Sequence, residues 1–408
     1  MHITLIALGS RGDVQPYATL GQGLQAAGHR VRFATFESFA PLIQSHGLEL
    51  HPIQGDAQAL VGGAGADMLK LVRSFGSLAR GYAADLTPLA SLKADLIINQ
   101  LPGALYGYDL AEKLGAPLML AGVIPLTASR TYPNLAFPPL PSSGYNLLTH
   151  RLAEQMLWAM FRGVINEWRQ KTLGLPPSPF FGYFRELDRK RVPVLNGFSE
   201  HIVPRPPDWG DHVHLTGYWF PRDEAWRPPA ELQSFIDSGS PPVFVGFGSM
   251  PVRDPARTTR ILLDGIQQSG QRAILHAGWA GLGNEALPAN VFAIEYAPYD
   301  WLFPRMAAII HHGGAGTTHF GLRAGVPSMI VPFVFDQFYW GNRLEELGVG
   351  SPPIPFSRLS ANRLAQAINR MTTDSAMRSR AAGLGETIRA EDGLARAIKI
   401  IEKRGEDK

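Results

Sequence analysis

The sequence predicts an α/β fold made of doubly wound domains, in which helices cover both faces of a parallel β-sheet. Three observations support this prediction. Short apolar runs alternate with helical patterns in both halves of the chain, which is typical of parallel sheets. The length of 408 residues corresponds to two or three domains. A proline-rich stretch over residues 204–230 separates the two alternating regions, and we interpret it as an interdomain linker.

The first alternating region, residues 1–203, is expected to form the N-terminal domain. Strands are predicted where a short run of mostly aliphatic residues is followed by turn-forming residues, namely at 3–8, 31–35, 96–99, 118–123 and 192–196. Helices are predicted between them, at about 16–27, 104–115 and 152–173.

The alternation resumes after the linker, and residues 231–389 are expected to form the C-terminal domain. The same patterns predict strands at 243–247, 273–276, 291–296, 307–311 and 328–331. They predict helices near 255–269, 317–324, 338–347 and 361–372.

The composition excludes several classes of protein. The 38 Lys and Arg against 35 Asp and Glu leave a net charge of +3, and 45% of the residues are apolar, which argues against a nucleic-acid-binding or a disordered chain. The absence of cysteine excludes disulfides and cysteine-ligated zinc. No apolar run approaches the roughly 20 residues of a membrane span, and no signal peptide is recognisable. We therefore expect a cytoplasmic protein, with at most peripheral contact to a membrane.

Both predicted domains begin with the same short motif, a strand followed by a Gly-Ser pair. The first strand of each runs into a Gly-Ser pair, Gly9-Ser10 in one domain and Gly248-Ser249 in the other. Ligands of open α/β sheets bind at the carboxyl edge of the strands, so two facing domains are expected to share one cleft. The alternative is that each pair only makes a tight turn.

A glycine-rich segment after the strand 307–311 is the strongest local signal. Residues 309–318 read Ile-Ile-His-His-Gly-Gly-Ala-Gly-Thr-Thr, so a buried strand passes through glycines into a helix start. Helix N-termini present unbonded N–H groups, and a neighbouring histidine can donate to a phosphate oxygen. A phosphate site is the favoured interpretation. The alternative makes Thr317 an N-cap and both histidines packing residues, while a metal site is disfavoured because adjacent strand residues point to opposite faces.

Asp336 and Gln337 follow the predicted strand 328–331 and are interpreted as a site for sugar hydroxyls. A carboxylate beside an amide offers both acceptors and donors to vicinal hydroxyls. The alternative is an N-cap by Asp336. With a phosphate site about twenty residues upstream, a nucleotide-sugar is the simplest ligand.

Asp13 lies in the turn after the first strand and is the candidate general base. Its carboxylate is suited to take a proton from a hydroxyl nucleophile. The alternative is helix capping, because Asp13 precedes Pro16 and a helical pattern. The residues alone leave both roles open.

Six motifs, in this order, resemble the GT-B glycosyltransferases of the UDP-glycosyltransferase superfamily. The similarity is greatest to sterol glucosyltransferases and to bacterial enzymes that glycosylate macrolides, glycopeptides and lipids. The motifs lie at residues 9–16, 246–250, 277–279, 298–304, 311–318 and 332–337. The resemblance implies two facing Rossmann-like domains, with the acceptor bound by the first and the nucleotide-sugar by the second. It also implies that a C-terminal helix within residues 390–408 crosses back to the N-terminal domain.

The resemblance also implies roles for individual residues. Asp13 becomes the general base, as in the bacterial and sterol branches, whereas plant members carry a histidine there. Trp279 and Tyr296 are rival platforms for stacking the nucleobase. Asp336 and Gln337 bind hydroxyls of the donor sugar in this comparison. The diphosphate contacts are Ser10, Ser249, His312, Gly314, Gly316, Thr317 and Thr318.

The expected activity is inverting transfer of a hexose, glucose by preference, from a UDP-sugar to a hydroxyl of a lipophilic acceptor such as a sterol, polyketide, flavonoid or lipid. Because the helix dipole and side chains would stabilise the leaving diphosphate, no metal or other cofactor is expected. A nucleotide-sugar epimerase of the same fold and a non-catalytic nucleotide-sugar-binding protein are the alternatives. We expect a monomer or weak dimer that does not bind nucleic acid.

Aromatic residues between 132 and 184 are the candidates for the acceptor pocket, in the region where family members form it. The four residues predicted to line this pocket are Trp158, Phe161, Phe180 and Phe181. An apolar stripe at helical spacing, Leu152, Met156, Met160, Val164 and Trp168, is by default assigned to core packing.

Overall fold

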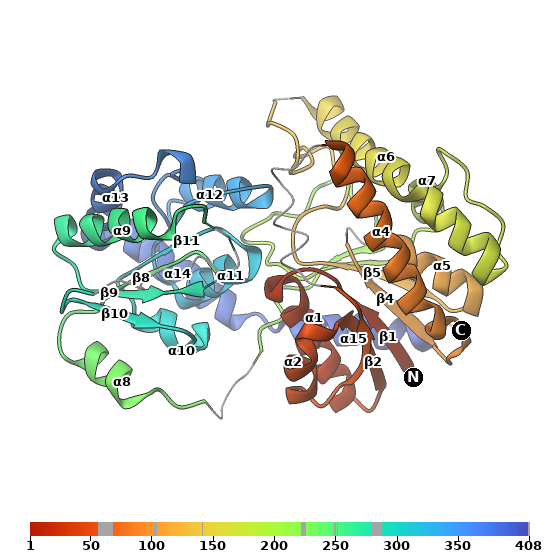
Figure 1. Cartoon of the computed structure of the whole chain (residues 1–408), viewed down its shortest axis with the longest axis horizontal. Helices are drawn as coiled ribbons and strands as arrows, with labels where there is room; N and C mark the ends of the chain where they lie inside the picture. Colours follow the sequence, from red (N-terminus) through yellow and green to blue (C-terminus); the bar gives the residue numbers. More distant parts are fainter. Residues whose placement is uncertain are drawn as a thin grey trace. The chain divides into compact units, whose positions relative to one another are not determined.

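The computed structural model describes residues 1–55, 68–101, 104–140, 142–221, 226–248, 250, 252–278 and 287–406. The chain divides into two compact units (Figure 1). The first comprises Met1–Pro221 together with Asp392–Lys408, and the second comprises Arg222–Glu391. Each unit holds a parallel β-sheet with helices, so the predicted α/β fold is confirmed.

The first unit contains a seven-stranded parallel sheet in the order β3-β2-β1-β4-β5-β6-β7. The strands are β1 (His2–Ile6), β2 (Arg30–Phe36), β3 (Glu49–Ile53), β4 (Leu96–Gln100), β5 (Leu118–Gly122), β6 (Val194–Asn196) and β7 (Val213–Leu215). Its helices include α1 (Arg11–Ala26), α2 (Ala40–Ser45), α4 (Met68–Leu86), α5 (Ala104–Leu114), α6 (Ser143–Trp168), α7 (Tyr183–Arg189) and α15 (Gly393–Glu406).

The second unit contains a five-stranded parallel sheet in the order β10-β9-β8-β11-β12. The strands are β8 (Val243–Gly246), β9 (Ala273–His276), β10 (Val291–Ile294), β11 (Ala308–His311) and β12 (Ser328–Ile330). Its helices include α8 (Ala230–Asp237), α9 (Pro255–Ser269), α10 (Tyr299–Leu302), α11 (Ala315–Ala324), α12 (Asp336–Glu346), α13 (Ala361–Thr373) and α14 (Ser375–Ala390).

Strand order is what positions a ligand site in such sheets. In each unit the chain adds two strands on one side of the first strand and then crosses to the other side. The reversal falls between β1 and β4 in the first sheet and between β8 and β11 in the second. These are topological switch points, where ligands of doubly wound folds bind at the carboxyl ends of the strands.

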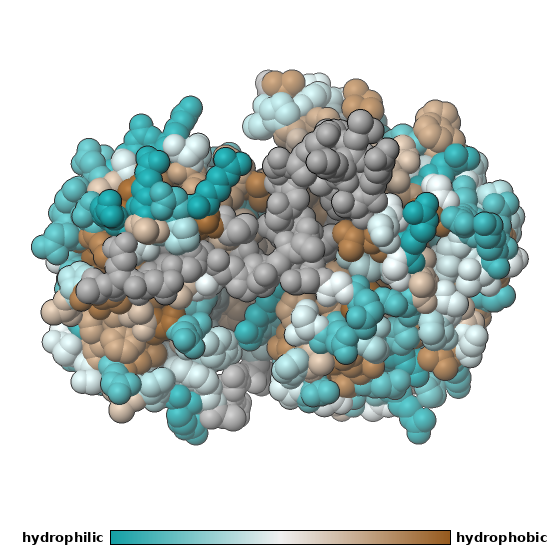
Figure 2. All heavy atoms as spheres, viewed as in Figure 1, coloured by the Kyte–Doolittle hydropathy of each residue, from teal (hydrophilic) through white to brown (hydrophobic). Residues whose placement is uncertain are grey.

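The central strands are mostly apolar and buried, because helices cover both sheet faces. On the face shown in Figure 2, hydrophilic residues are spread over both units, with apolar residues in small groups among them, as is usual for a protein surface.

The C-terminal helix α15 packs on α1 of the first unit (Figure 1). Its residues Ala397 and Ile401 are fully buried in the core of that unit. Gly23 of α1 permits the close approach, because a Cβ there would lie 2.8 Å from Cδ1 of Ile398. The last helix therefore completes the first unit.

Several boundaries differ from the sequence prediction. β3 and β7 were not predicted, and β7 lies inside the proposed linker, where it pairs with β6 at the sheet edge. α1 begins five residues before Pro16, because Ser10 and Asp13 form the capping interaction at its start. α6 begins at Ser143, where the side chain of Ser142 accepts a hydrogen bond from the amide of Tyr145. The prediction thus placed the start of α1 too late, at Pro16, and missed the N-cap of α6 at Ser142.

Candidate active site

The Asp13 carboxylate lies at the switch point of the first sheet, in the first turn of α1. Its Oδ2 accepts hydrogen bonds from the Ser10 amide at 2.8 Å and the Ser10 hydroxyl at 2.9 Å. Gly9 has a φ of +142°, and a Cβ there would lie 2.6 Å from Oδ2, so only glycine fits against the carboxylate. Burial raises the pKa of Asp13, and the hydrogen bonds from Ser10 lower it by a smaller amount. A carboxylate with a raised pKa is a stronger base than an exposed one.

The structure shows one of the two roles considered for Asp13, helix capping, and the role as general base stays a prediction. The carboxylate caps α1 through the Ser10 amide, and the same interaction fixes its orientation. Ser10 was predicted to contact the diphosphate, but both of its donors are bonded to Asp13 in this structure. The phosphate role of Ser10 stays a prediction.

Tyr17 anchors the helix that carries Asp13. Its buried hydroxyl donates to the carbonyl of Ala121 on β5 at 2.7 Å. On the neighbouring side of the switch point, the amide of Leu8 donates to Oε1 of Gln100 on β4 at 2.7 Å. Neither contact was predicted, because each joins residues more than ninety positions apart.

The glycine-rich segment after β11 has the geometry of an anion site. β11 ends at His311, Gly313 has a φ of +94°, and α11 begins at Ala315 with Gly314 as N-cap. The amides of the first helical turn, at Ala315, Gly316 and Thr317, have no acceptor within the helix. Thr318 differs from the prediction, because its amide and hydroxyl both donate to the carbonyl of Gly314, at 3.0 Å. Its donors are therefore used inside the helix.

The His312 ring lies against the backbone at the switch point of the second sheet. A Cβ on Gly248 would lie 2.8 Å from its Cε1, and a Cβ on Gly314 would lie 2.5 Å from its Nε2. Burial, and to a smaller degree nearby His276, lowers the pKa of His312 to about 4. The ring is therefore neutral at pH 7 and carries one N–H. Its buried Nδ1 has no hydrogen-bond partner among the described residues, as expected of an atom that awaits a ligand.

His311 points away from His312. The two rings are 6.2 Å apart at 87°, and Nδ1 of His311 accepts a hydrogen bond from the Gly313 amide at 3.1 Å. This is the opposite-face arrangement that argued against a shared metal ion. Ser249, the other predicted phosphate contact here, lies outside the described residues.

Asp336 and Gln337 open α12 but do not have equivalent surroundings. Oδ2 of Asp336 accepts a hydrogen bond from the Trp340 indole at 3.0 Å. Gln337 is buried, and its Oε1 accepts from the amides of Phe333 and Val334 at 2.7 and 3.1 Å. Its Nε2 lies 3.2 Å from the sulfur of Met250. Gln337 thus stabilises the loop before α12, whereas it was predicted to bind sugar hydroxyls. The N-cap of α12 is Phe335 rather than Asp336.

The nucleobase candidates can be placed only in part. Tyr296 follows β10 and is 46% exposed, which leaves its ring accessible. Trp279 lies outside the described residues.

Trp158 was predicted to line the acceptor pocket, but its surroundings are those of a scaffold residue. The side chain is only 1% exposed and stacks on Tyr183 at 4.6 Å, and its indole donates to the carbonyl of Pro179 at 3.0 Å. Phe161 is partly buried. Phe180 and Phe181 are 44% and 63% exposed.

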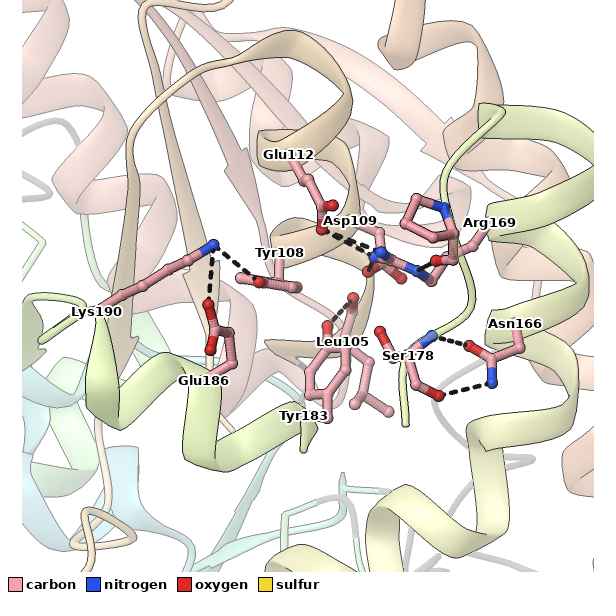
Figure 3. A network of polar contacts seen from close by, with 11 residues as sticks. Leu105, Tyr108, Asp109, Glu112, Asn166, Arg169, Ser178, Tyr183, Glu186 and Lys190 are labelled. Carbon is pink, nitrogen blue, oxygen red and sulfur yellow. Dashed lines mark hydrogen bonds and ion pairs between the residues drawn. The ribbon is translucent and has the colours of Figure 1, made fainter. Parts of the chain in front are cut away.

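The segment that presents Phe180 and Phe181 is held along α6. Gln155 donates to the carbonyl of Phe180 at 3.0 Å, and Asn166 exchanges two hydrogen bonds with the backbone of Ser178 (Figure 3). The two phenyl rings are therefore presented by a fixed backbone.

The apolar stripe of α6 is buried only near its end. Val164 and Trp168 are buried, but Leu152, Met156 and Met160 are exposed. Assignment of the whole stripe to the core was wrong, because helical spacing identifies a face and not what covers it.

A buried ion network supports this region (Figure 3). Arg169, in the π-helical turn Arg169–Leu173 that follows α6, pairs with Asp109 and Glu112 of α5. Asp109 is fully buried, and its burial raises its pKa to about 7 although Arg169 lowers it. Arg169 also donates to the carbonyl of Pro176 at 2.8 Å. This network was not predicted, because its partners lie about 60 positions apart in the sequence.

Within the described residues, no helix is long and apolar enough to cross a membrane, and no group of three or more His, Asp or Glu could hold a metal ion.

Two family models match the two halves of the chain. Residues 3–133 match the glycosyltransferase family 28 N-terminal domain, and residues 261–402 match the erythromycin biosynthesis protein CIII-like C-terminal domain.

Two relatives with similar sequences are sterol 3-beta-glucosyltransferases. The chain is 36% identical to a sterol 3-beta-glucosyltransferase of Arabidopsis thaliana, over 99% of this chain and 68% of the relative. It is 38% identical to the sterol 3-beta-glucosyltransferase of Aspergillus terreus, over 98% of this chain but 30% of that protein. The chain thus spans less than a third of the length of this fungal relative.

Two solved structures of similar fold are glycosyltransferases named after natural products. The glycotransferase of kitacinnamycin has a TM-score of 0.75 at 21% identity, over 98% of both chains. The calicheamicin glycosyltransferase has a TM-score of 0.72 at 18% identity, over 98% of this chain and 97% of that one. These similarities establish the GT-B fold. With 36% identity to the plant relative over 99% of its own length, the chain belongs to the sterol glucosyltransferase group of the GT-B glycosyltransferases, a family of hexosyltransferases.

Proposed function

We propose that this protein transfers a hexose, glucose by preference, from a UDP-sugar to the hydroxyl of a lipophilic acceptor of the sterol class, with inversion at the anomeric carbon. The observation that carries the proposal is the anion site of the second unit. There a buried neutral histidine with an unpartnered ring nitrogen lies beside the unbonded amides of α11. The names of the curated relatives support the sterol class.

The second unit binds the donor. The amides of Gly316 and Thr317, the Thr317 hydroxyl and the His312 N–H contact the diphosphate, and the α11 dipole stabilises its charge as it leaves. Thymidine diphosphate is bound in a solved Streptomyces enzyme of the same fold, so the base of the nucleotide is part of the test. Asp336 binds hydroxyls of the sugar.

The first unit binds the acceptor and activates it. Asp13 takes the proton of the acceptor hydroxyl, and the oxygen forms a bond to the anomeric carbon as the bond to the diphosphate breaks. The proton passes to Asp13 and the electron pair of the broken bond stays with the diphosphate, so the step balances without a metal ion. Phe180 and Phe181, exposed on a fixed backbone, contact the apolar body of the acceptor.

The proposal is tested by offering UDP-glucose, UDP-galactose and dTDP-glucose with a sterol, a flavonoid and a macrolide. Release of UDP, a sterol that gains one hexosyl group, and a β-linkage in the product by NMR are expected. Conversion of the UDP-sugar without acceptor would identify an epimerase. Binding without turnover of any acceptor would identify a binding protein.

His312→Ala is expected to weaken UDP binding by about 1.5–3 kcal/mol, the contribution of a hydrogen bond to a charged group. Isothermal calorimetry of UDP measures the effect. His150→Ala is the matched control, because His150 is also buried but lies in the first unit, where its Nε2 is 3.1 Å from the carbonyl oxygen of Tyr132. Equal losses of UDP affinity in the two variants would contradict the phosphate role of His312.

EDTA is expected to leave the rate of transfer largely unchanged, because the helix dipole and side chains stabilise the leaving diphosphate. The measurement is the rate of UDP release before and after chelation. A complete loss of activity that Mg²⁺ restores would show that a metal ion stabilises the leaving group instead.

A further inference from the structure

Trp340 lies one helical turn after Asp336 on α12, and it is fully buried. Its indole N–H donates to Oδ2 of Asp336 at 3.0 Å. The hydrogen bond joins residues at i and i+4, which are neighbours on one helix face. The carboxylate of Asp336 is therefore hydrogen-bonded to a side chain that is itself fixed by packing in the core.

The ring of Trp340 also joins two helices. It meets His319 of α11 edge to face, with ring centres 5.2 Å apart and an angle of 88°. Burial lowers the pKa of His319 to about 3, so the contact is between two neutral rings at pH 7. α11 is the helix whose first turn forms the anion site, and α12 is the helix that carries Asp336.

The backbone before Asp336 is equally constrained. Phe335 has a φ of 50°, a conformation that residues with side chains rarely adopt. Such strain persists only where neighbouring contacts impose it. Here Gln337 supplies them through its hydrogen bonds to the amides of Phe333 and Val334. The carboxylate is thus fixed from the backbone side by this turn and from the side-chain side by Trp340.

We propose that Trp340 is a positioning residue for recognition of the donor sugar. Its N–H orients the Asp336 carboxylate, and its ring sets the distance of α12 from the helix that binds the diphosphate. The inference rests on the proposed function, in which Asp336 binds hydroxyls of the sugar. Because Trp340 is buried, it acts through Asp336 and does not touch the donor.

The test is Trp340→Phe, which removes the N–H and keeps an aromatic ring. The dissociation constant of UDP-glucose is expected to rise about tenfold, the size of one lost hydrogen bond between the misoriented Asp336 carboxylate and the sugar. That of UDP, which has no sugar, should stay within about twofold, because the diphosphate contacts are unchanged. The ratio of kcat/KM for UDP-glucose to that for UDP-galactose should fall. A merely structural role would weaken both ligands alike and leave that ratio unchanged.

The matched control is Trp209→Phe in the first unit. Trp209 is also buried, and its indole donates to the carbonyl of Ala128 at the same distance of 3.0 Å. This variant should lose comparable stability without any change in UDP-glucose affinity. If it weakens UDP-glucose as much as Trp340→Phe does, the proposal is overturned.

A double-mutant cycle with Asp336→Asn separates this inference from the proposed function. With Asp336 replaced, Trp340→Phe should have no further effect on the preference for UDP-glucose over UDP. If Asp336→Asn alone leaves this preference unchanged, the sugar-binding role in the proposed function fails. If Asp336→Asn abolishes it and Trp340→Phe does not alter it, only the role of Trp340 fails.

A second variant covers the case in which Trp340→Phe does not fold. Trp340 is replaced by 3-benzothienylalanine, in which sulfur stands in place of the indole N–H and the shape is kept. The same rise in the UDP-glucose dissociation constant is expected. An unchanged constant would overturn the proposal.

Discussion

Asp13→Asn is expected to lower kcat about 10²–10⁴-fold, because a general base contributes a factor of that order. Asparagine cannot take the proton from the acceptor hydroxyl. Its side-chain carbonyl can still accept the hydrogen bond from the Ser10 amide, and Asn caps helices about as well as Asp. The variant should therefore fold normally and bind UDP-glucose with unchanged affinity.

The dependence of kcat/KM on pH gives an independent readout of the same step. The base must be ionised, so activity should fall as the pH is lowered through the pKa of Asp13. Burial raises this pKa above the usual aspartate value of 3.8, so the acidic limb should lie above that value. Asp13→Asn should lack this limb. If Asp13→Asn keeps a near-normal kcat and Asp336→Asn abolishes turnover with donor binding preserved, the roles of the two aspartates are reversed.

Arg169→Met is expected to cost about 3–5 kcal/mol of unfolding free energy, the usual effect of removing one partner of a buried ion pair. The variant leaves Asp109 buried without its cation and removes the hydrogen bond to the carbonyl of Pro176. Urea denaturation followed by circular dichroism measures the loss.

The pH dependence of this loss has a definite sign. The folded-state pKa of Asp109 is raised, to about 7, so the folded protein binds the proton more tightly than the unfolded chain does. Its contribution to stability is fully present below the unfolded value of 3.8 and is lost as the pH rises through about 7. Without Arg169 the ionised form is less favourable still, so the deficit should be smaller at pH 5 than at pH 8.

Arg189→Met is the matched control, because it removes an exposed ion pair with Glu186. Its unfolding midpoint should be nearly that of the wild type. Equal destabilisation by Arg169→Met and Arg189→Met would show that burial of the Arg169 network is unimportant.

Much of the fold could be predicted because its signals are local. Buried parallel strands are short aliphatic runs, and all ten predicted strands correspond to strands of the structure. β3 carries charged and polar residues, and β7 lies among prolines, so neither has that pattern.

The candidate site was predictable in part for the same reason. A strand, glycines and a helix start are contiguous around His312. The contact of Gln337 with Met250, by contrast, joins residues 87 positions apart, which no local pattern indicates. Arg169 and Asp109 are 60 positions apart, and nothing in either neighbourhood indicates that they pair. The exposure of Met156 and Met160 depends on what covers α6, which spacing cannot indicate.

The return of α15 to the first unit has a consequence for synthesis of the chain. Ala397 and Ile401 belong to the core that β1 and α1 begin to build, yet they follow the whole second unit in the chain and are synthesised after it. Residues 222–391 form their own compact unit and are complete before then. Domains generally fold as units during synthesis, commonly from the N-terminus onward. Here the order is inverted, since the second unit can reach its final state while the first unit, which is begun earlier, still lacks a helix.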